Sequence, residues 1–143
     1  MPGLVNRVSE QDASRRPVVL VVEDELLPRM SIAAYLREAG FVVVEAMKAD
    51  DAMVVLSAEL GIDAVFCDIK LPGAVNGVEL SRWIGEHHEN LPVLLTSGKV
   101  DFTVAAAIAC GGYIAKPYIY ANVERRIRAL IAARWDGGPP AAS

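Results

Sequence analysis

The sequence predicts an α/β domain in which helices cover both faces of a parallel β-sheet. Short apolar runs alternate with longer segments whose apolar residues recur near the helical period. Of the 143 residues, 53% are hydrophobic, which is enough to bury one sizeable core. We therefore expect one domain over residues 17–134, with a flexible N-terminal tail at 1–16 and a short C-terminal tail at 135–143.

Each expected element has a local signal in the chain. Val18 to Val22 is apolar throughout, as in a central parallel strand that is buried on both faces. The next segment carries an apolar stripe that includes Leu27 and Met30, with Pro28 in its first turn and Gly40 as a stop. We expect strands at 18–22, 41–46, 64–68, 93–97 and 113–115, and helices at 27–39, 49–60, 77–86, 102–109 and 119–134, with 102–109 short or irregular.

The order of the strands decides which residues meet. Right-handed crossovers limit the topologies, and a flavodoxin-like (βα)5 doubly wound sheet with strand order 2-1-3-4-5 fits the alternation. In that order the first and third strands are neighbours, so Glu23, Asp24 and Asp68 converge at their carboxyl ends. Ser97 and Lys116 follow the fourth and fifth strands and flank the same crevice. We expect the functional site at this edge of the sheet.

Three carboxylates in one crevice repel one another. At about 5 Å and an effective dielectric constant near 20, each pair costs roughly 3 kcal/mol. The carboxylates stay ionised together only if a cation joins them, or if one of them takes up a proton. Oxygen ligands without His or Cys suit a hard ion such as Mg²⁺, with Mn²⁺ as an alternative.

The same residues suit phosphoryl transfer. Asp68 is the better candidate for a nucleophile because it stands alone at its strand end, whereas Glu23 and Asp24 are paired as ligands would be. Lys116 would add a positive charge and Ser97 a hydroxyl donor around that carboxylate. The other interpretation is that these are unrelated strand-end residues and helix caps.

Composition excludes several classes of function. A net charge of −4 leaves no basic footprint for nucleic acid, and the arginines of the last predicted helix are either a solvated face or a partner patch. The longest apolar run, Val104 to Cys110, is too short for a membrane span. The first residues lack the apolar core of a signal peptide, so we expect a cytoplasmic protein. Cys67 and Cys110 form neither a disulfide framework nor a metal spacing.

Four stretches together resemble the receiver domain of two-component response regulators. They are VVLVVEDE, VFCDIKLPG with Gly77 after it, PVLLTSG and GYIAKPY, and the resemblance covers residues 18–134. It implies a phosphoacceptor signalling protein rather than an enzyme, one that catalyses its own phosphorylation and slowly loses the phosphoryl group. The chain departs from the family in two places: Ser97 and Lys116 are only 19 residues apart, and the loop 72–77 looks one residue longer than is common.

The resemblance also implies a role for each site residue. By it, Asp68 is the phosphoacceptor and Lys116 binds the phosphoryl group. Mg²⁺ would be held by Glu23, Asp24, Asp68 and the backbone carbonyl of Lys70; Ser97 and Tyr113 would be switch residues; and the Lys116–Pro117 peptide bond would be cis.

The implied partners are proteins. A histidine kinase or a histidine phosphotransfer protein would donate the phosphoryl group, and a downstream protein would read the result. With no output domain expected, the chain would signal by binding that protein, by passing phosphate on, or as a homodimer through the fourth helix, fifth strand and fifth helix. Neither nucleic acid nor a membrane is expected as a partner.

Two other functions compete with this interpretation. A haloacid-dehalogenase-like phosphatase also uses an Asp nucleophile, Mg²⁺ and a Lys, but it needs an Asp-x-Asp where this chain has Asp24 followed by Glu25 and Leu26. It also needs a cap segment, which is not expected here. The other competitor is a receiver-like interaction module that binds partners without being phosphorylated.

Overall fold

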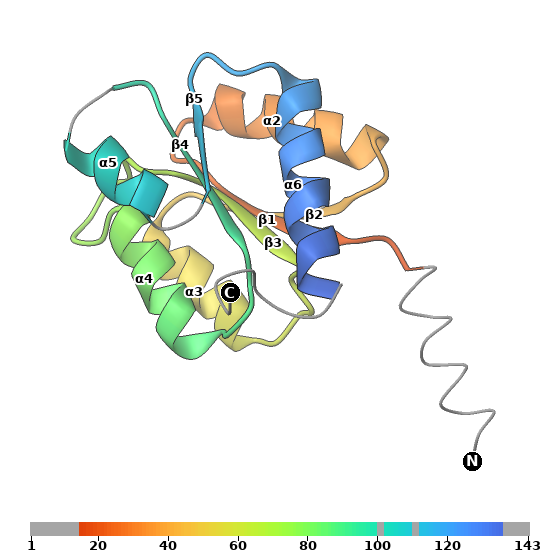
Figure 1. Cartoon of the computed structure of the whole chain (residues 1–143), viewed down its shortest axis with the longest axis horizontal. Coiled ribbons are helices and arrows are strands. Elements are labelled where there is room, and N and C mark those ends of the chain that lie inside the picture. The colour runs from red at the N-terminus through yellow and green to blue at the C-terminus, as the bar shows by residue number, and fades with distance from the viewer. Residues whose placement is uncertain (1–14, 100–101, 110–111, 136–143) are drawn as a thin grey trace.

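Five parallel strands form one sheet in the order β2-β1-β3-β4-β5 (Figure 1). The structure is a computed structural model that describes residues 15–99, 102–109 and 112–135. The strands are β1 (Val18–Val22), β2 (Val42–Ala46), β3 (Ala64–Asp68), β4 (Val93–Ser97) and β5 (Tyr113–Ala115). The expected flavodoxin-like class and strand order are confirmed.

Helices cover the sheet on both faces, with α2 and α6 on one side and α3, α4 and α5 on the other (Figure 1). They are α2 (Leu26–Glu38), α3 (Ala49–Ser57), α4 (Gly77–His87), α5 (Phe102–Ala109) and α6 (Tyr120–Trp135). Alternate residues of each strand serve the two cores, because side chains in a strand point to opposite faces. Val19 and Val21 pack under α2 and α6, whereas Leu20 and Val22 pack on the opposite side.

Most element boundaries lie within one residue of those expected from the sequence, and α5, with eight residues, is the shortest described helix. The exception is α3, which ends at Ser57 rather than at 60. Glu59 has a φ of 53°, in the left-handed region that stops a helix. Among the described residues, none of the helices combines the length and the apolar character that crossing a bilayer requires.

The apolar stripe expected for α2 is wrong in part. Leu27 and Met30 were expected in the core, but they are 74% and 52% exposed. The helix instead turns another stripe to the sheet, because the guanidinium of Arg29 bonds to groups at the ends of β1 and β2 and brings that side inward. The residues buried on this side are Arg29, Ile32, Ala33 and Leu36.

The expected tails fall mostly outside the described residues, as does Cys110. Of the N-terminal tail, Arg15 and Arg16 are described, and Arg15 donates two hydrogen bonds to the buried carboxylate of Asp63, at 3.0 and 2.9 Å. Asp63 also accepts the backbone N–H of Val18 at 2.8 Å. The Asp63 carboxylate, which directly precedes β3, therefore ties residues 15–18 at the start of β1 to the start of β3.

The start of α4 is fixed against the end of β3. Asn76 caps the helix, since its side chain accepts from the backbone N–H of Glu79 and its own N–H donates to the Glu79 carboxylate. The Gly77 N–H then donates to the Ile69 carbonyl at 2.8 Å. A Cβ at Gly77 would collide with the Asp68 carbonyl oxygen and would lie 2.7 Å from the Ile69 Cα. Only glycine allows α4 to begin this close to Asp68.

Two identical substitutions in α4 test this packing. Gly77→Ala should lower the free energy of unfolding by about 1–3 kcal/mol, because the backbone around Asp68 must move. Gly85→Ala should raise it by roughly 0.5–1 kcal/mol, because a Cβ there meets open space among the described residues and alanine favours the helix. Urea denaturation of both variants measures the difference, and equal effects would contradict the close packing at Gly77.

Candidate functional site

Three carboxylates meet at the carboxyl edge of the sheet, as the strand order requires. Glu23 and Asp24 follow β1, Asp68 ends β3, and the two strands pair directly. One carboxylate oxygen from each of the three residues lies within 4.8 Å of the others. Glu23 is 5% and Asp68 7% exposed, whereas Asp24 faces solvent. Two of the three charges are therefore largely removed from water.

Lys116 joins the two buried carboxylates. Its ammonium donates to Asp68 Oδ2 at 2.6 Å and to Glu23 Oε1 at 3.0 Å. The residue follows β5, and its backbone N–H is held by the Ser97 carbonyl at 3.0 Å, so the side chain starts from a fixed point. The Lys116–Pro117 peptide bond is cis. In this arrangement the ammonium serves as the counter-ion of the acid cluster.

Backbone N–H groups hold the remaining oxygens of the same carboxylates. Glu23 Oε2 accepts from the Glu25 N–H at 3.1 Å, and Asp68 Oδ1 accepts from the Lys70 N–H at 3.0 Å. Each carboxylate is thus bonded through both oxygens, which fixes its plane. A carboxylate held in this way is oriented in advance for reaction or for binding a cation.

The local charges shift two pKa values at the site. Burial raises the pKa of Glu23 above its usual value, although the hydrogen bonds from Glu25 and Lys116 act against it. Because Glu23 holds its proton more tightly in the folded than in the unfolded state, the folded state loses stability as pH rises from the usual Glu pKa to the raised one. A bound cation would offset this loss. Burial alone would lower the pKa of Lys116, but its hydrogen bonds to Asp68 and Glu23 raise it above the usual lysine value. The ammonium stays charged, and the stability that it contributes is lost only in strongly alkaline solution.

The donor set fits a hard divalent cation. The three carboxylates supply oxygen ligands that lie close together, and one of them is open to solvent. Oxygen ligands from carboxylates, with room left for water, are what Mg²⁺ prefers in proteins. A cation bound there would also take over part of the positive charge that the Lys116 ammonium now places beside Glu23 and Asp68.

Asp68 opens into a cavity of about 610 Å³. Beside Asp68 and Lys116, its lining carries two more lysines, Lys70 and Lys99, and the hydroxyl of Ser97. The lining therefore carries three lysines and a hydroxyl beside two carboxylates, those of Asp68 and Glu25. An anionic group such as a phosphoryl group suits this lining.

The two expected switch residues are bonded to each other rather than to Asp68. The Ser97 hydroxyl donates to the Lys99 carbonyl at 3.0 Å and accepts from the Lys99 N–H at 3.1 Å. The hydroxyl of half-buried Tyr113 donates to the Ser97 carbonyl at 3.1 Å. Ser97, the last residue of β4, thus lies at the cavity, but its hydroxyl is bonded to the backbone of Lys99 just after the strand.

Sequence reasoning missed two residues at this site: Lys99, which bonds the Ser97 hydroxyl, and Arg29. The Arg29 guanidinium is buried and donates to the backbone carbonyl of Glu23 at 2.9 Å. The available signal was a charged residue on the side of α2 that also carries Ile32 and Leu36. Hydropathy alone assigned that helix to face the core through Leu27 and Met30 instead.

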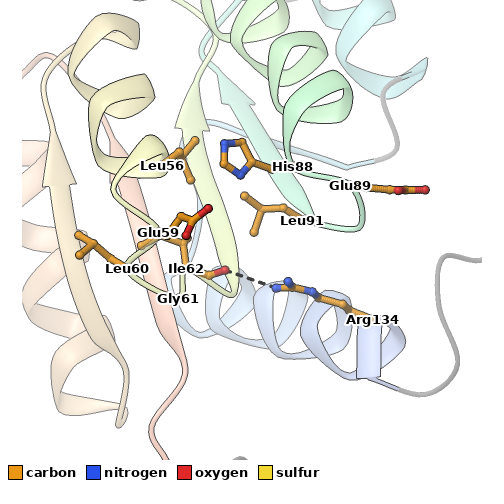
Figure 2. A pocket seen from close by; sticks show the side chains of 9 residues that line it. All are labelled: Leu56, Glu59, Leu60, Gly61, Ile62, His88, Glu89, Leu91 and Arg134. Carbon is orange, nitrogen blue, oxygen red and sulfur yellow. Dashed lines mark hydrogen bonds between the residues drawn. The ribbon is translucent and has the colours of Figure 1, made fainter.

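A second cavity, of about 270 Å³, lies where α3, α4 and α6 end (Figure 2). Leu56, Ile62 and Leu91 contribute its apolar part, and Arg134 lies beside them. The Arg134 guanidinium donates to the carbonyls of Ile62, at 3.4 Å, and Asp63, at 3.2 Å. Because Ile62 and Asp63 precede β3, this cavity is at the edge of the sheet opposite to Asp68 and takes no part in its chemistry.

Comparison with known proteins identifies the family. The family model described as the response regulator receiver domain matches residues 19–128, so the chain belongs to this family. The aerobic respiration control protein ArcA of Escherichia coli is 33% identical over 125 residues, which cover 85% of this chain and 51% of ArcA. The two-component response regulator PhoP of Pseudomonas aeruginosa is 31% identical over 116 residues, covering 79% and 51%. The chain spans about half the length of these curated relatives.

Solved structures show the same fold. A CheY-like response regulator receiver domain protein from Methanospirillum hungatei superposes with a TM-score of 0.79 at 21% identity, covering 86% of this chain and 99% of that one. The receiver domain of NtrX from Brucella abortus gives a TM-score of 0.73 at 30% identity, covering 80% and 98%.

Removing the Lys116 ammonium tests its role as counter-ion. In EDTA, Lys116→Ala should lower the free energy of unfolding by about 1.5–3 kcal/mol, because two buried carboxylates lose a charged donor. The same variant should bind Mg²⁺ several-fold more tightly than the wild type, because the competing cation is gone. Thermal unfolding with and without Mg²⁺ measures both effects. Lys99→Ala, which removes an exposed lysine at the cavity, is the control; equal stability of the two variants in EDTA would contradict the assignment.

Proposed function

We propose that this receiver domain takes a phosphoryl group onto Asp68 from a phosphohistidine on a histidine kinase or a histidine phosphotransfer protein. The observation that supports this most is the setting of the Asp68 carboxylate. It is buried, both of its oxygens are held by N–H donors, and it opens into the cavity of about 610 Å³. The family of the chain makes a phosphohistidine protein the natural donor.

The chemical step is a displacement at phosphorus. An oxygen of Asp68 forms a bond to phosphorus while the phosphorus–nitrogen bond of the donor breaks. The electron pair of that bond stays on the imidazole nitrogen, which takes up a proton. The product is an aspartyl phosphate, which water can later hydrolyse to free Asp68 and inorganic phosphate.

Glu23, Asp24, Asp68 and the backbone carbonyl of Lys70 would hold the Mg²⁺ ion. When bound, the ion neutralises negative charge on the transferring phosphoryl oxygens. Lys116 would also neutralise charge on the phosphoryl oxygens, because its ammonium already touches Asp68 Oδ2. The Lys70 N–H, bonded to Asp68 Oδ1, keeps the carboxylate in place during the attack.

Phosphorylation adds about −1.5 to −2 charge at Asp68, together with oxygens that accept strong hydrogen bonds. We expect the Ser97 hydroxyl to leave its bonds with Lys99 and donate to the phosphoryl group. Since Tyr113 is bonded to the Ser97 carbonyl, this movement would reach β5 and the flanking helices α5 and α6. A downstream protein, or a second copy of the chain, would read the altered surface.

The donor protein would dock beside α2. A hollow of about 600 Å³ lies there and shares Gly98 and Lys116 with the lining of the acid cavity. Residues of α2 and of the segment 116–120 line this hollow. Leu27 of α2 is among them and is 74% exposed, and Met30 of α2 and Ile119 of the second segment are also exposed apolar residues. A protein seated here would bury these side chains and bring its phosphohistidine next to Asp68.

The phosphoacceptor assignment is tested by mass spectrometry. Wild-type protein treated with acetyl phosphate and Mg²⁺ should gain one phosphoryl group, and Asp68→Asn should gain none, because the amide cannot form the acyl phosphate. Asp51→Asn, an exposed site on α3, is the matched control and should behave as the wild type. Uptake by Asp68→Asn would overturn the assignment. Mg²⁺ binding without uptake by the wild type would favour a pure interaction module, and turnover of a small phosphate ester would favour a phosphatase.

The docking surface is tested with the histidine kinase that phosphorylates the wild type fastest in a phosphotransfer profile. Leu27→Asp should slow transfer from that kinase on the order of tenfold, because a charge replaces a buried apolar contact. Val54→Asp, at an equally exposed apolar site on α3, should leave the rate unchanged. Acetyl phosphate should phosphorylate both variants at the wild-type rate, and a loss there for Leu27→Asp would mean damage to the site rather than to docking.

A further inference from the structure

We propose that Arg29 is a positioning residue for the divalent-cation site, through its hold on the backbone that carries Glu23 and Asp24. The inference rests on the proposed function only in taking these two carboxylates, with Asp68, as the cation ligands. Arg29 has no contact with the ligand oxygens among the hydrogen bonds of the described residues; it acts on the chain that bears them.

Arg29 is bonded to the backbone carbonyls on both sides of Asp24. Its Nη1 donates to the Glu23 carbonyl at 2.9 Å, and its own backbone N–H donates to the Glu25 carbonyl at 3.1 Å. The Glu23 N–H, in turn, donates to the Ala46 carbonyl at 3.1 Å. The peptide groups around Glu23 and Asp24 are therefore held by α2 on one side and by β2 on the other.

The guanidinium reaches this position because it is itself anchored. Arg29 is only 9% exposed, and its Nε donates to the Glu45 carboxylate on β2 at 3.2 Å. Glu45 lies opposite Val21, two residues before Glu23 on β1. A buried arginine in an otherwise apolar stripe is unfavourable unless its donors are used, and here they tie α2, β1 and β2 together at the edge that carries the acids.

Fixing that backbone fixes the ligands. Glu23 and Asp24 are adjacent, so a small rotation of the peptide between them would move the two carboxylates in different directions. Groups that orient metal ligands from outside the coordination shell commonly change metal affinity by 10- to 100-fold when they are removed. The positive charge of Arg29 would act in the opposite sense, by repelling a divalent cation, although Glu45, which it shares with Arg37, offsets part of that charge.

Positioning of the ligands and repulsion by charge can be separated, because they predict opposite changes in Mg²⁺ affinity when Arg29 is replaced by Gln. If Arg29 positions the ligands, Arg29→Lys and Arg29→Gln both weaken Mg²⁺ binding. Each replacement has a single donor nitrogen, whereas Arg29 uses Nε for the Glu45 carboxylate and Nη1 for the Glu23 carbonyl. If Arg29 acts only by charge, Arg29→Gln strengthens Mg²⁺ binding and Arg29→Lys leaves it unchanged.

Isothermal titration of the full chain with Mg²⁺ alone decides between them. We expect the dissociation constant to rise on the order of tenfold in Arg29→Lys and in Arg29→Gln. Arg37→Lys and Arg37→Gln are matched controls, because Arg37 binds the same Glu45 carboxylate, at 3.1 Å, and the Val43 carbonyl in place of the Glu23 carbonyl. Both controls should bind Mg²⁺ as the wild type does.

Thermal unfolding in EDTA, run on each variant, distinguishes positioning from a general loss of structure. Lower stability with unchanged Mg²⁺ affinity in the folded protein would overturn the proposal, as would equal weakening in the Arg37 variants. If Arg29→Gln does not fold, Arg29→Lys, which keeps the buried charge, decides alone. A wild type that binds Mg²⁺ but takes up no phosphoryl group would end the proposed function while leaving the role of Arg29 intact.

Discussion

The structure depends on how two carboxylates, those of Glu23 and Asp68, are accommodated side by side in a buried position. Glu23 and Asp68 are almost fully removed from water, and each offers a carboxylate oxygen within 4.8 Å of the other. Two negative charges this close repel by several kcal/mol unless a cation lies between them. The Lys116 ammonium lies there, bonded to both. Because one ammonium is bonded to both acids, a second cation or an anionic group at the site would change what Lys116 binds. We propose that this exchange makes the site responsive to phosphorylation.

Topology, rather than local sequence, brings this cluster together. The acid pair, Asp68 and Lys116 come from β1, β3 and the segment after β5, and the parallel order of the sheet brings all three ends to one edge. Gly77 lets α4 begin directly against Asp68, and Arg29 holds the turn after β1. The acid cluster is therefore held by the ends of paired strands, and Ser97, the last residue of β4, is followed by the exposed residues Gly98 and Lys99.

Much of this could be predicted from the chain alone, because parallel strands read as uninterrupted apolar runs and each run ends at a polar residue. That pattern was sufficient for the strands, the sheet order and the convergence of Glu23, Asp24, Asp68 and Lys116. The exposure of Leu27 and Met30 could not be predicted, since hydropathy counts Arg29 as a surface residue although its donors are satisfied inside. The direction of the Ser97 hydroxyl was also beyond sequence reasoning, because a rotatable group follows its immediate partners.

A crystal structure with Mg²⁺ and beryllofluoride tests most directly whether Lys116 is an exchangeable counter-ion. The account predicts beryllium bonded to Asp68, and the Lys116 ammonium moved from Glu23 Oε1, where it is now 3.0 Å away, to the fluoride ligands. Beryllofluoride attached to another residue, or a Lys116 ammonium still on Glu23 after Asp68 is modified, would contradict it.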